Sequence, residues 1–170
     1  MPVKRSAAHK AREVRMLLLD VDGVMTDGGI YYSERGGEIK RFNAQDGYGV
    51  VRAREHGLKI AIVSGRSTPV VATRAKKLRI DEVHQNSADK VAVMQKIRKK
   101  YRLREEQIAF MGDELFDIPL LRAVGFSAAP SNARPEVKKI VDYASPVCGG
   151  EGAVRDVIDF IIRCQLRNRS

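Results

Sequence analysis

Three aspartates at the ends of two apolar segments are the residues of this sequence best suited to catalysis. Asp20 and Asp22 follow the apolar run 16–19, and Asp113 follows the run 108–111. A short apolar run that ends in polar residues is typical of a buried parallel strand followed by a loop. Carboxylates gathered at strand ends repel each other unless a cation lies among them, and hard oxygen ligands suit Mg²⁺. The pattern indicates a Mg²⁺ site, although a plain Asp-Gly turn would also explain the first pair.

A second group of residues could bind a phosphate. Ser64, Gly65 and Arg66 follow the apolar run 58–63, and Lys90 lies at the start of a helix predicted over 87–102. A hydroxyl, an ammonium and the backbone N–H groups at helix starts are phosphate ligands. Taken alone, Lys90 is more often a solvated helix lysine and Ser64-Gly65 a plain turn.

Together the two groups allow phosphoryl transfer. With a cation and a lysine withdrawing charge from a phosphoryl group, Asp20 can act as nucleophile and form an aspartyl phosphate. Asp22, two residues on, can protonate the leaving oxygen and later activate water.

The elements that position these residues alternate between strand and helix, which predicts a parallel sheet with helices on both faces. The predicted strands are 14–20, 58–63, 80–84, 108–111, 124–128 and a short edge strand at 142–144. The predicted helices are 46–56, 69–78, 87–102, 115–123, 134–141 and 153–165. Residues 28–42 read as a β-hairpin with a Glu-Arg-Gly-Gly tip, which must pack on its own domain or on another subunit. In such a sheet the functional residues collect at the carboxyl ends of the strands.

Composition limits the class of protein. With 170 residues and 31% charged residues, the chain is expected to form one globular domain over 14–166, preceded by a basic, flexible arm over 1–13. No apolar run reaches membrane-spanning length, and no secretory signal is recognisable. The two cysteines, Cys148 and Cys164, form no metal-binding pattern and fit a reducing cytoplasm.

The net charge of +10 lies mostly in the two ends of the chain. Residues 1–15 hold five basic residues against one acidic residue, and residues 160–170 hold three arginines and no acidic residue. These ends lack the interleaved aromatic residues that stack on bases, so no specific nucleic-acid binding is expected.

The joint pattern resembles the haloacid dehalogenase superfamily of phosphatases. That family has Asp-x-Asp-Gly after the first strand, Ser or Thr after the second, a later Lys, and Gly-Asp-x-x-x-Asp after the fourth. Here these are residues 20–23, Ser64, Lys90 and 112–117. The resemblance implies that Asp20 is the nucleophile and a Mg²⁺ ligand, and that Asp22 is the general acid/base and a ligand through its backbone carbonyl. It makes Asp113 the third ligand, supported by Asp117.

The fold class expected is α/β, a three-layer Rossmann-like parallel sheet with a protruding β-hairpin and no cap domain. Only 43 residues separate Asp20 from Ser64, and 48 separate Ser64 from Asp113, and predicted elements fill both intervals. A cap domain over the site does not fit in either interval.

A narrower resemblance covers about residues 15–165. Residues 20–28, the hairpin, residues 40–49 and the segment 149–155 resemble the capless phosphatases that act on 3-deoxy-D-manno-octulosonate 8-phosphate (KDO 8-phosphate), a step in lipopolysaccharide precursor synthesis. Members of that family are homotetramers in which hairpins pair and a neighbour closes the site. The resemblance implies a cytoplasmic homotetramer whose substrate is a small phosphorylated sugar acid. The substrate contacts that it implies are Asp22, Asn43, Ala44, Gln45, Asp46, Gly47, Ser64, Gly65, Arg66, Arg74 and Lys90.

The sequence differs from the family at two positions, and three alternative functions remain open. Relatives often have Asp at the position of Glu114 and some have an arginine at that of Val51. One alternative substrate is a nine-carbon sialic-type sugar acid 9-phosphate, although sister enzymes for it tend to have Glu-Lys where this chain has Arg66-Ser67. The others are a nucleic-acid 3′-phosphatase, suggested by the basic ends, and a non-enzymic scaffold of the same fold.

Overall fold

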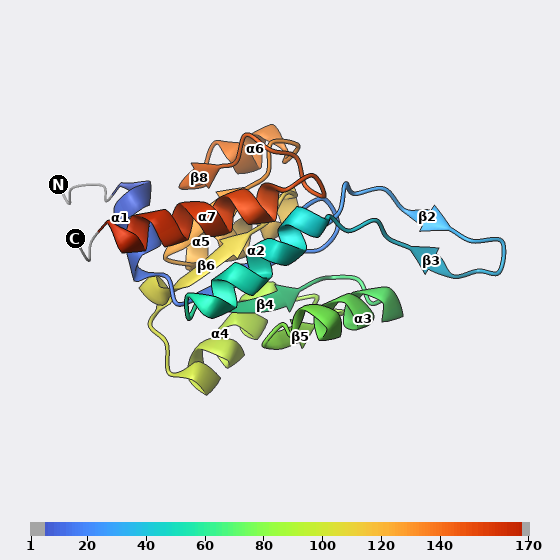
Figure 1. The fold of residues 1–170 in the computed structure, drawn as a ribbon, viewed down its shortest axis with the longest axis horizontal. Coiled ribbons are helices and arrows are strands. Elements are labelled where there is room, and N and C mark those ends of the chain that lie inside the picture. Colours follow the sequence, from blue (N-terminus) through green and yellow to red (C-terminus); the bar gives the residue numbers. More distant parts are fainter. Residues whose placement is uncertain (1–5, 168–170) are drawn as a thin grey trace.

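The computed structural model describes residues 6–167 and has a central sheet covered by helices on both faces (Figure 1). Six parallel strands lie in the order β5-β4-β1-β6-β7-β8. Their bounds are β1 Met16–Leu19, β4 Lys59–Val63, β5 Glu82–His84, β6 Ile108–Met111, β7 Phe126–Ala129 and β8 Tyr143–Ala144. The helices are α1 Ala7–Glu13, α2 Ala44–Glu55, α3 Pro69–Leu78, α4 Lys90–Tyr101, α5 Ile118–Ala123, α6 Pro135–Lys138 and α7 Ala153–Leu166, with 3₁₀ turns η1 Glu105–Gln107 and η2 Leu115–Asp117. This is the predicted three-layer α/β fold.

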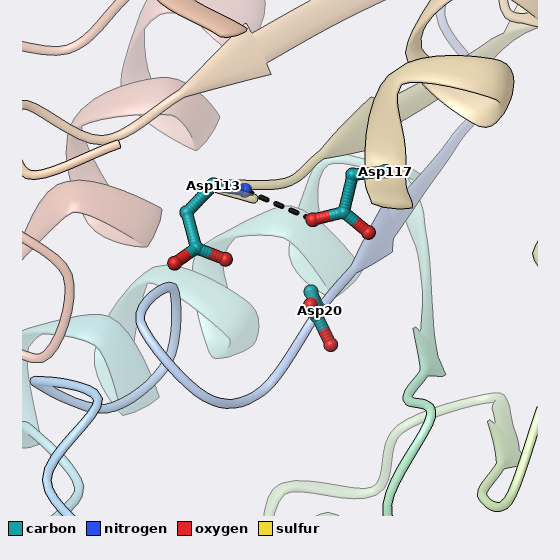
Figure 2. A group of neighbouring side chains, drawn as sticks. All are labelled: Asp20, Asp113 and Asp117. Atoms are coloured by element: carbon teal, nitrogen blue, oxygen red, sulfur yellow. Dashed lines mark hydrogen bonds between the residues drawn. The ribbon is translucent and has the colours of Figure 1, made fainter. Parts of the chain in front are cut away.

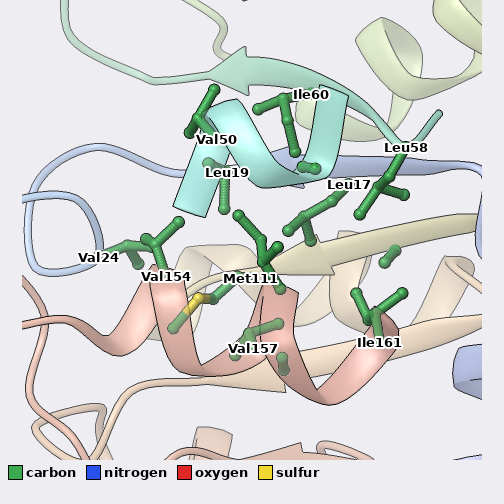
Figure 3. Packing of buried hydrophobic residues seen from close by; sticks show 14 of the residues in the cluster. Leu17, Leu19, Val24, Val50, Leu58, Ile60, Met111, Val154, Val157 and Ile161 are labelled. Carbon is green, nitrogen blue, oxygen red and sulfur yellow. The ribbon is translucent and has the colours of Figure 1, made fainter. Parts of the chain in front are cut away.

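Strand β1 explains why the sheet is covered on both sides. All four of its residues are fully buried, and β4 and β6 pair with it on either side. Because successive side chains point to opposite faces, Leu17 and Leu19 pack under α2 and α7, while Met16 and Leu18 pack under α4 and α5. Figure 3 shows the first of these two clusters, where helices α2 and α7 close over the sheet. A strand buried on both faces must be apolar throughout, as this one is.

The amino-terminal segment corrects one prediction. Residues 1–13 are expected to form a flexible arm, but Ala7–Glu13 form α1, which packs on α7 with Ala11 fully buried. The hydroxyl of Ser6 accepts a hydrogen bond from the N–H of His9 and caps the helix at 3.2 Å. This cap and the small apolar residues behind it let a short helix join the core. The basic residues at 1–5 and Arg169 lie outside the described residues.

The hairpin projects from the body of the molecule at the carboxyl-terminal edge of the sheet (Figure 1). Its strands, β2 (Tyr31–Tyr32) and β3 (Glu38–Ile39), are antiparallel and make a separate two-stranded sheet. Tyr32 is 71% exposed and Ile39 55% exposed, so these apolar side chains are not covered by their own domain. Phe42, just beyond the hairpin, packs against the core of its own chain.

Other differences from the sequence prediction are small shifts of boundary. The segment predicted as one helix over 115–123 is a 3₁₀ turn followed by α5, and the helix predicted over 134–141 stops at Lys138. None of the helices within residues 6–167 combines the length and apolarity that crossing a bilayer requires.

Candidate active site

The candidate site lies where strands β1, β4 and β6 end. A hollow of about 250 Å³ opens there. Its lining residues are Asp20, Asp22, Gly23, Gly28, Ser64, Gly65, Arg66, Asp113, Glu114 and Phe116. The structure thus brings together the residues that the sequence places after three different strands.

Three carboxylates meet at and beneath the floor of this hollow, the third of them fully buried. Oxygens of Asp20, Asp113 and Asp117 lie within 4.8 Å of one another. In Figure 2 the side chains of Asp20, Asp113 and Asp117 lie close together, and the dashed line marks the hydrogen bond from the N–H of Asp113 to the carboxylate of Asp117. Asp117 is fully buried, and its Oδ2 accepts the backbone N–H groups of Asp113 at 3.0 Å and Glu114 at 3.2 Å. The second aspartate of the Gly-Asp-x-x-x-Asp pattern therefore holds the loop that presents the first.

Two glycines allow the aspartates to approach. Gly23 has φ +82°, and a Cβ there would lie 2.0 Å from Oδ2 of Asp113. A Cβ on Gly112 would lie 2.7 Å from Oδ2 of Asp117. The glycine that follows Asp22 is thus required both by the left-handed backbone and by the closeness of Asp113.

Lys90 is the cation of the cluster. Its Nζ lies 2.9 Å from Oδ2 of Asp20 and 2.7 Å from Oδ1 of Asp117, and its side chain is only 5% exposed. It stands at the first position of α4, which Asp89 caps by accepting the N–H of Ala92. The reading of Lys90 as a solvated surface lysine is wrong.

Burial and neighbouring carboxylates raise the pKa of two of the aspartates. Burial raises the pKa of Asp20 to about 6, with Lys90 acting against this and Asp117 adding to it. Burial and the neighbouring carboxylates of Asp20, Asp117 and Glu114 raise the pKa of Asp113 to about 7. A bound cation would reverse both shifts, because it favours the ionised carboxylates.

This donor set fits a Mg²⁺ ion. Within residues 6–167, Oδ1 of Asp113 is buried and has no hydrogen-bond partner. Such an atom is costly unless something binds it, and three carboxylates around one point are hard oxygen ligands. Asp20 and Asp113 would hold the ion through their carboxylates, and Asp22 is expected to do so through its backbone carbonyl.

The side chain of Asp22 lines the same hollow but is not part of this carboxylate cluster. It is 23% exposed, forms an ion pair with Nζ of Lys40, and lies 3.6 Å from Nε of Arg66. Burial acts to lower the pKa of Lys40, but hydrogen bonds to Asp22 and Glu38 outweigh it, so the pKa is raised and the ammonium is charged. Lys40 belongs to the segment 40–49 that carries the family resemblance, but no sequence pattern indicates this pairing.

Ser64 and Arg66 lie on the other side of the hollow. Ser64 is buried at the end of β4, and its Oγ accepts the backbone N–H of Arg66 at 3.3 Å. The guanidinium of Arg66 is partly exposed at the rim and lies 3.1 Å from Glu38. Glu114 turns its carboxylate onto the N–H of Leu115 at 2.7 Å, where it caps the 3₁₀ turn η2. It is therefore engaged with its own loop.

The other predicted substrate contacts form a separate group. Asn43, Asp46, Gly47 and Arg74 line a narrow hollow between α2 and α3, and none of them lines the hollow that contains the aspartates. Arg74 donates to the carbonyl of Asn43 at 3.3 Å, and Asp46 accepts the N–H of Arg155 at 2.9 Å.

Within one chain these contacts are structural. Burial raises the pKa of Asp46, and hydrogen bonds from N–H groups at the start of α7 act against this. Ala44 and Gln45 are exposed at the start of α2.

Asn132 is a residue of the site that no sequence pattern indicates. Its amide donates to the carbonyl of Gly23 at 3.0 Å and accepts the N–H of Gly149 at 2.6 Å. It clamps the loop after β1 to the glycine-rich segment before α7. Gly23 and Gly149 are more than a hundred positions apart in the sequence, so no local pattern predicts this contact.

Comparisons with known proteins agree with this site. Residues 78–158 match the model of the haloacid dehalogenase-like hydrolases. The chain is 37% identical over 164 residues to the 3-deoxy-D-manno-octulosonate 8-phosphate phosphatase of Escherichia coli K12, covering 96% of this chain and 87% of that protein.

Solved structures give the same family. The phosphatase of that name from Yersinia pestis superposes with a TM-score of 0.92 at 35% identity and covers 96% of this chain and 89% of that one. The Moraxella catarrhalis enzyme, solved with a magnesium ion, a phosphate ion and KDO, has a TM-score of 0.92 at 34% identity, with 95% and 92% covered. The chain belongs to the 3-deoxy-D-manno-octulosonate 8-phosphate phosphatase family of the haloacid dehalogenase-like hydrolases.

Proposed function

We propose that this protein is a Mg²⁺-dependent phosphatase that hydrolyses KDO 8-phosphate to the free sugar acid and phosphate, in lipopolysaccharide precursor synthesis. The observation that supports it most is the buried cluster of Asp20, Lys90, Asp113 and Asp117 below a hollow lined by Ser64. Magnesium, when bound, withdraws charge from the phosphoryl oxygens.

The chain's own residues divide the chemistry between them. The carboxylate of Asp20 attacks phosphorus, the new O–P bond forms, and the bond from phosphorus to the sugar oxygen breaks. Asp22 gives its proton to that oxygen as it leaves. In the second half, Asp22 takes a proton from water, whose oxygen attacks phosphorus and releases Asp20. Ser64 and Lys90 bind the phosphoryl oxygens throughout, and Lys90 also keeps the carboxylate of Asp20 in place.

Arg66 supports an acidic sugar as the substrate. Its guanidinium lies at the rim of the hollow, 43% exposed, where it can accept a carboxylate in a bidentate geometry. The hollow of about 250 Å³ is small for an eight-carbon sugar phosphate, so the sugar extends beyond its rim.

A homotetramer would complete the site, and we propose this assembly. The exposed apolar residues of the hairpin support it: Ile30, Tyr31, Tyr32 and Ile39 are each at least 45% exposed. Exposed apolar patches of this kind mark association surfaces. The contacts proposed at Asn43, Ala44, Gln45, Asp46, Gly47 and Arg74 lie outside the hollow of their own chain. In the proposed tetramer a neighbouring copy would bring them to the sugar. We also propose the cytoplasm as the compartment.

Phosphate release from three substrates tests the proposal. KDO 8-phosphate, a nine-carbon sialic-type 9-phosphate and an oligonucleotide with a 3′-phosphate are compared at equal concentration with Mg²⁺. We expect kcat/KM to be highest for KDO 8-phosphate. A higher value for either of the other two substrates would contradict the assignment.

A further inference from the structure

Three charged side chains, those of Glu38, Lys40 and Arg66, connect the base of the hairpin to Asp22. Lys40 pairs with Asp22 and lies 2.8 Å from Oε1 of Glu38. Glu38 also accepts the guanidinium of Arg66 through both carboxylate oxygens, at 3.2 and 3.1 Å. Two carboxylates and two cationic side chains thus alternate in space between β3 and the active-site hollow.

Lys40 is the most enclosed member of this group. Its side chain is 1% exposed, whereas that of Asp22 is 23% and that of Glu38 14% exposed. An ammonium buried this fully is stable only with opposite charges around it, and here it has two carboxylates. In a surface ion pair the ammonium stays in contact with water, which is not so for Lys40.

The geometry points to Lys40 as a positioning residue for Asp22, with Glu38 fixing the position of Lys40. This inference rests on the proposed function, in which Asp22 protonates the leaving oxygen. Asp22 lies in a loop beyond β1 and, within residues 6–167, its carboxylate has only Lys40 and Arg66 as charged partners. Since Arg66 is 43% exposed and is the proposed partner of the sugar carboxylate, Lys40 is the fixed partner.

The chemistry of the leaving group provides the test. An alkoxide leaving from a sugar phosphate needs a proton from Asp22, whereas the nitrophenolate of p-nitrophenyl phosphate leaves without one. The ratio kcat/KM covers the steps up to the transfer of the phosphoryl group to Asp20 and so isolates this proton transfer. A misplaced general acid should therefore lower kcat/KM for the sugar phosphate selectively.

We expect Lys40→Met to lower kcat/KM for KDO 8-phosphate about 100-fold, within the range that general acid catalysis supplies, and that for p-nitrophenyl phosphate less than about 5-fold. Asp22→Asn should show the same selectivity, and adding Lys40→Met to it should cause no further loss. Lys40→Arg, which keeps a cation, should recover part of the activity. Lys10→Met is the matched control. It removes the ion pair of 2.7 Å between Lys10 on α1 and Asp142, and it should leave kcat/KM for both substrates unchanged.

The outcomes separate the inference from the function on which it rests. If Asp22→Asn lowers kcat/KM equally for KDO 8-phosphate and p-nitrophenyl phosphate, the acid role proposed for Asp22 is wrong. If Asp22→Asn lowers kcat/KM mainly for KDO 8-phosphate, but a folded Lys40→Met protein does not, the positioning role alone is wrong. If Lys40→Met does not fold, Glu38→Gln decides: a selective loss of several-fold supports the inference, and activity equal to that of the unsubstituted protein overturns it.

Discussion

Mg²⁺ binding should become much tighter as pH rises from 6 to 8, because the ion must displace protons from its ligands. In the metal-free protein Asp113 has a pKa of about 7 and Asp20 one of about 6. At pH 6 Asp113 is mostly protonated and Asp20 about half protonated, so the apparent Kd should exceed its limiting value about 20-fold. At pH 8 both are ionised and that factor is close to 1.

Isothermal titration calorimetry measures both quantities that this reasoning predicts. Titrations at pH 6, 7 and 8 give the apparent Kd, and paired buffers of different ionisation enthalpy give the number of protons released. We expect about 1.4 protons per Mg²⁺ at pH 6 and about 0.1 at pH 8. In Asp113→Asn, which should bind the ion more weakly overall, the change in Kd should shrink to about 2-fold. A change below about 3-fold in the unsubstituted protein, without proton release at pH 6, would show that protons on Asp113 and Asp20 do not compete with Mg²⁺.

The same protons affect stability. The pKa of Asp113 is about 7 in the folded protein and 3.8 as its ordinary value, so the folded state holds the proton more tightly. Asp113 therefore contributes up to about 4 kcal/mol to the free energy of unfolding. This contribution is complete below about pH 4 and is lost as the pH rises through about 7. Saturating Mg²⁺ should abolish this loss, which urea unfolding at each pH would detect.

Three substitutions extend the account. Lys90→Met leaves two buried carboxylates without the ammonium between them and should lower the free energy of unfolding by about 3–5 kcal/mol at pH 7, measured in urea; a change below about 1 kcal/mol would contradict the buried pairing. Gly23→Ala should weaken Mg²⁺ binding at least about 10-fold in calorimetry, because its Cβ would overlap Asp113; unchanged affinity would show that the loop relaxes without consequence. Tyr32→Glu on the exposed hairpin should convert the proposed tetramer to smaller species by light scattering, and a tetramer that persists would place the interface elsewhere.

The order of elements and the main cluster could be predicted because local patterns determine them. The apolar runs at 16–19, 58–63, 108–111 and 124–128 each correspond to a largely buried strand, and parallel strands bring their carboxyl ends to one edge. Asp20 and Asp113 are therefore neighbours in space even though 92 positions separate them. Helix α3, with Pro69 at its first turn, was predicted with its observed bounds.

The rest depends on contacts between distant segments. Lys40 looks like any basic residue after a hairpin until Asp22 and Glu38 are seen around it. Asp46 was expected at the sugar, yet its carboxylate accepts an N–H group at the start of α7, more than a hundred residues away. Helix α1 did have a local signal, the Ser6 cap, but seven residues form a stable helix only when a core surface covers them.

Phosphate release from KDO 8-phosphate by the unsubstituted protein and by Asp20→Asn is the most direct test of the central claim. With saturating Mg²⁺, the unsubstituted protein should release phosphate, and removal of the ion with a chelator should abolish this. Asp20→Asn should lower turnover by about 10⁴-fold or more while the fold is retained by circular dichroism, because an amide cannot attack phosphorus as the carboxylate does. Turnover within about 10-fold of the unsubstituted protein would contradict the claim that Asp20 is the nucleophile.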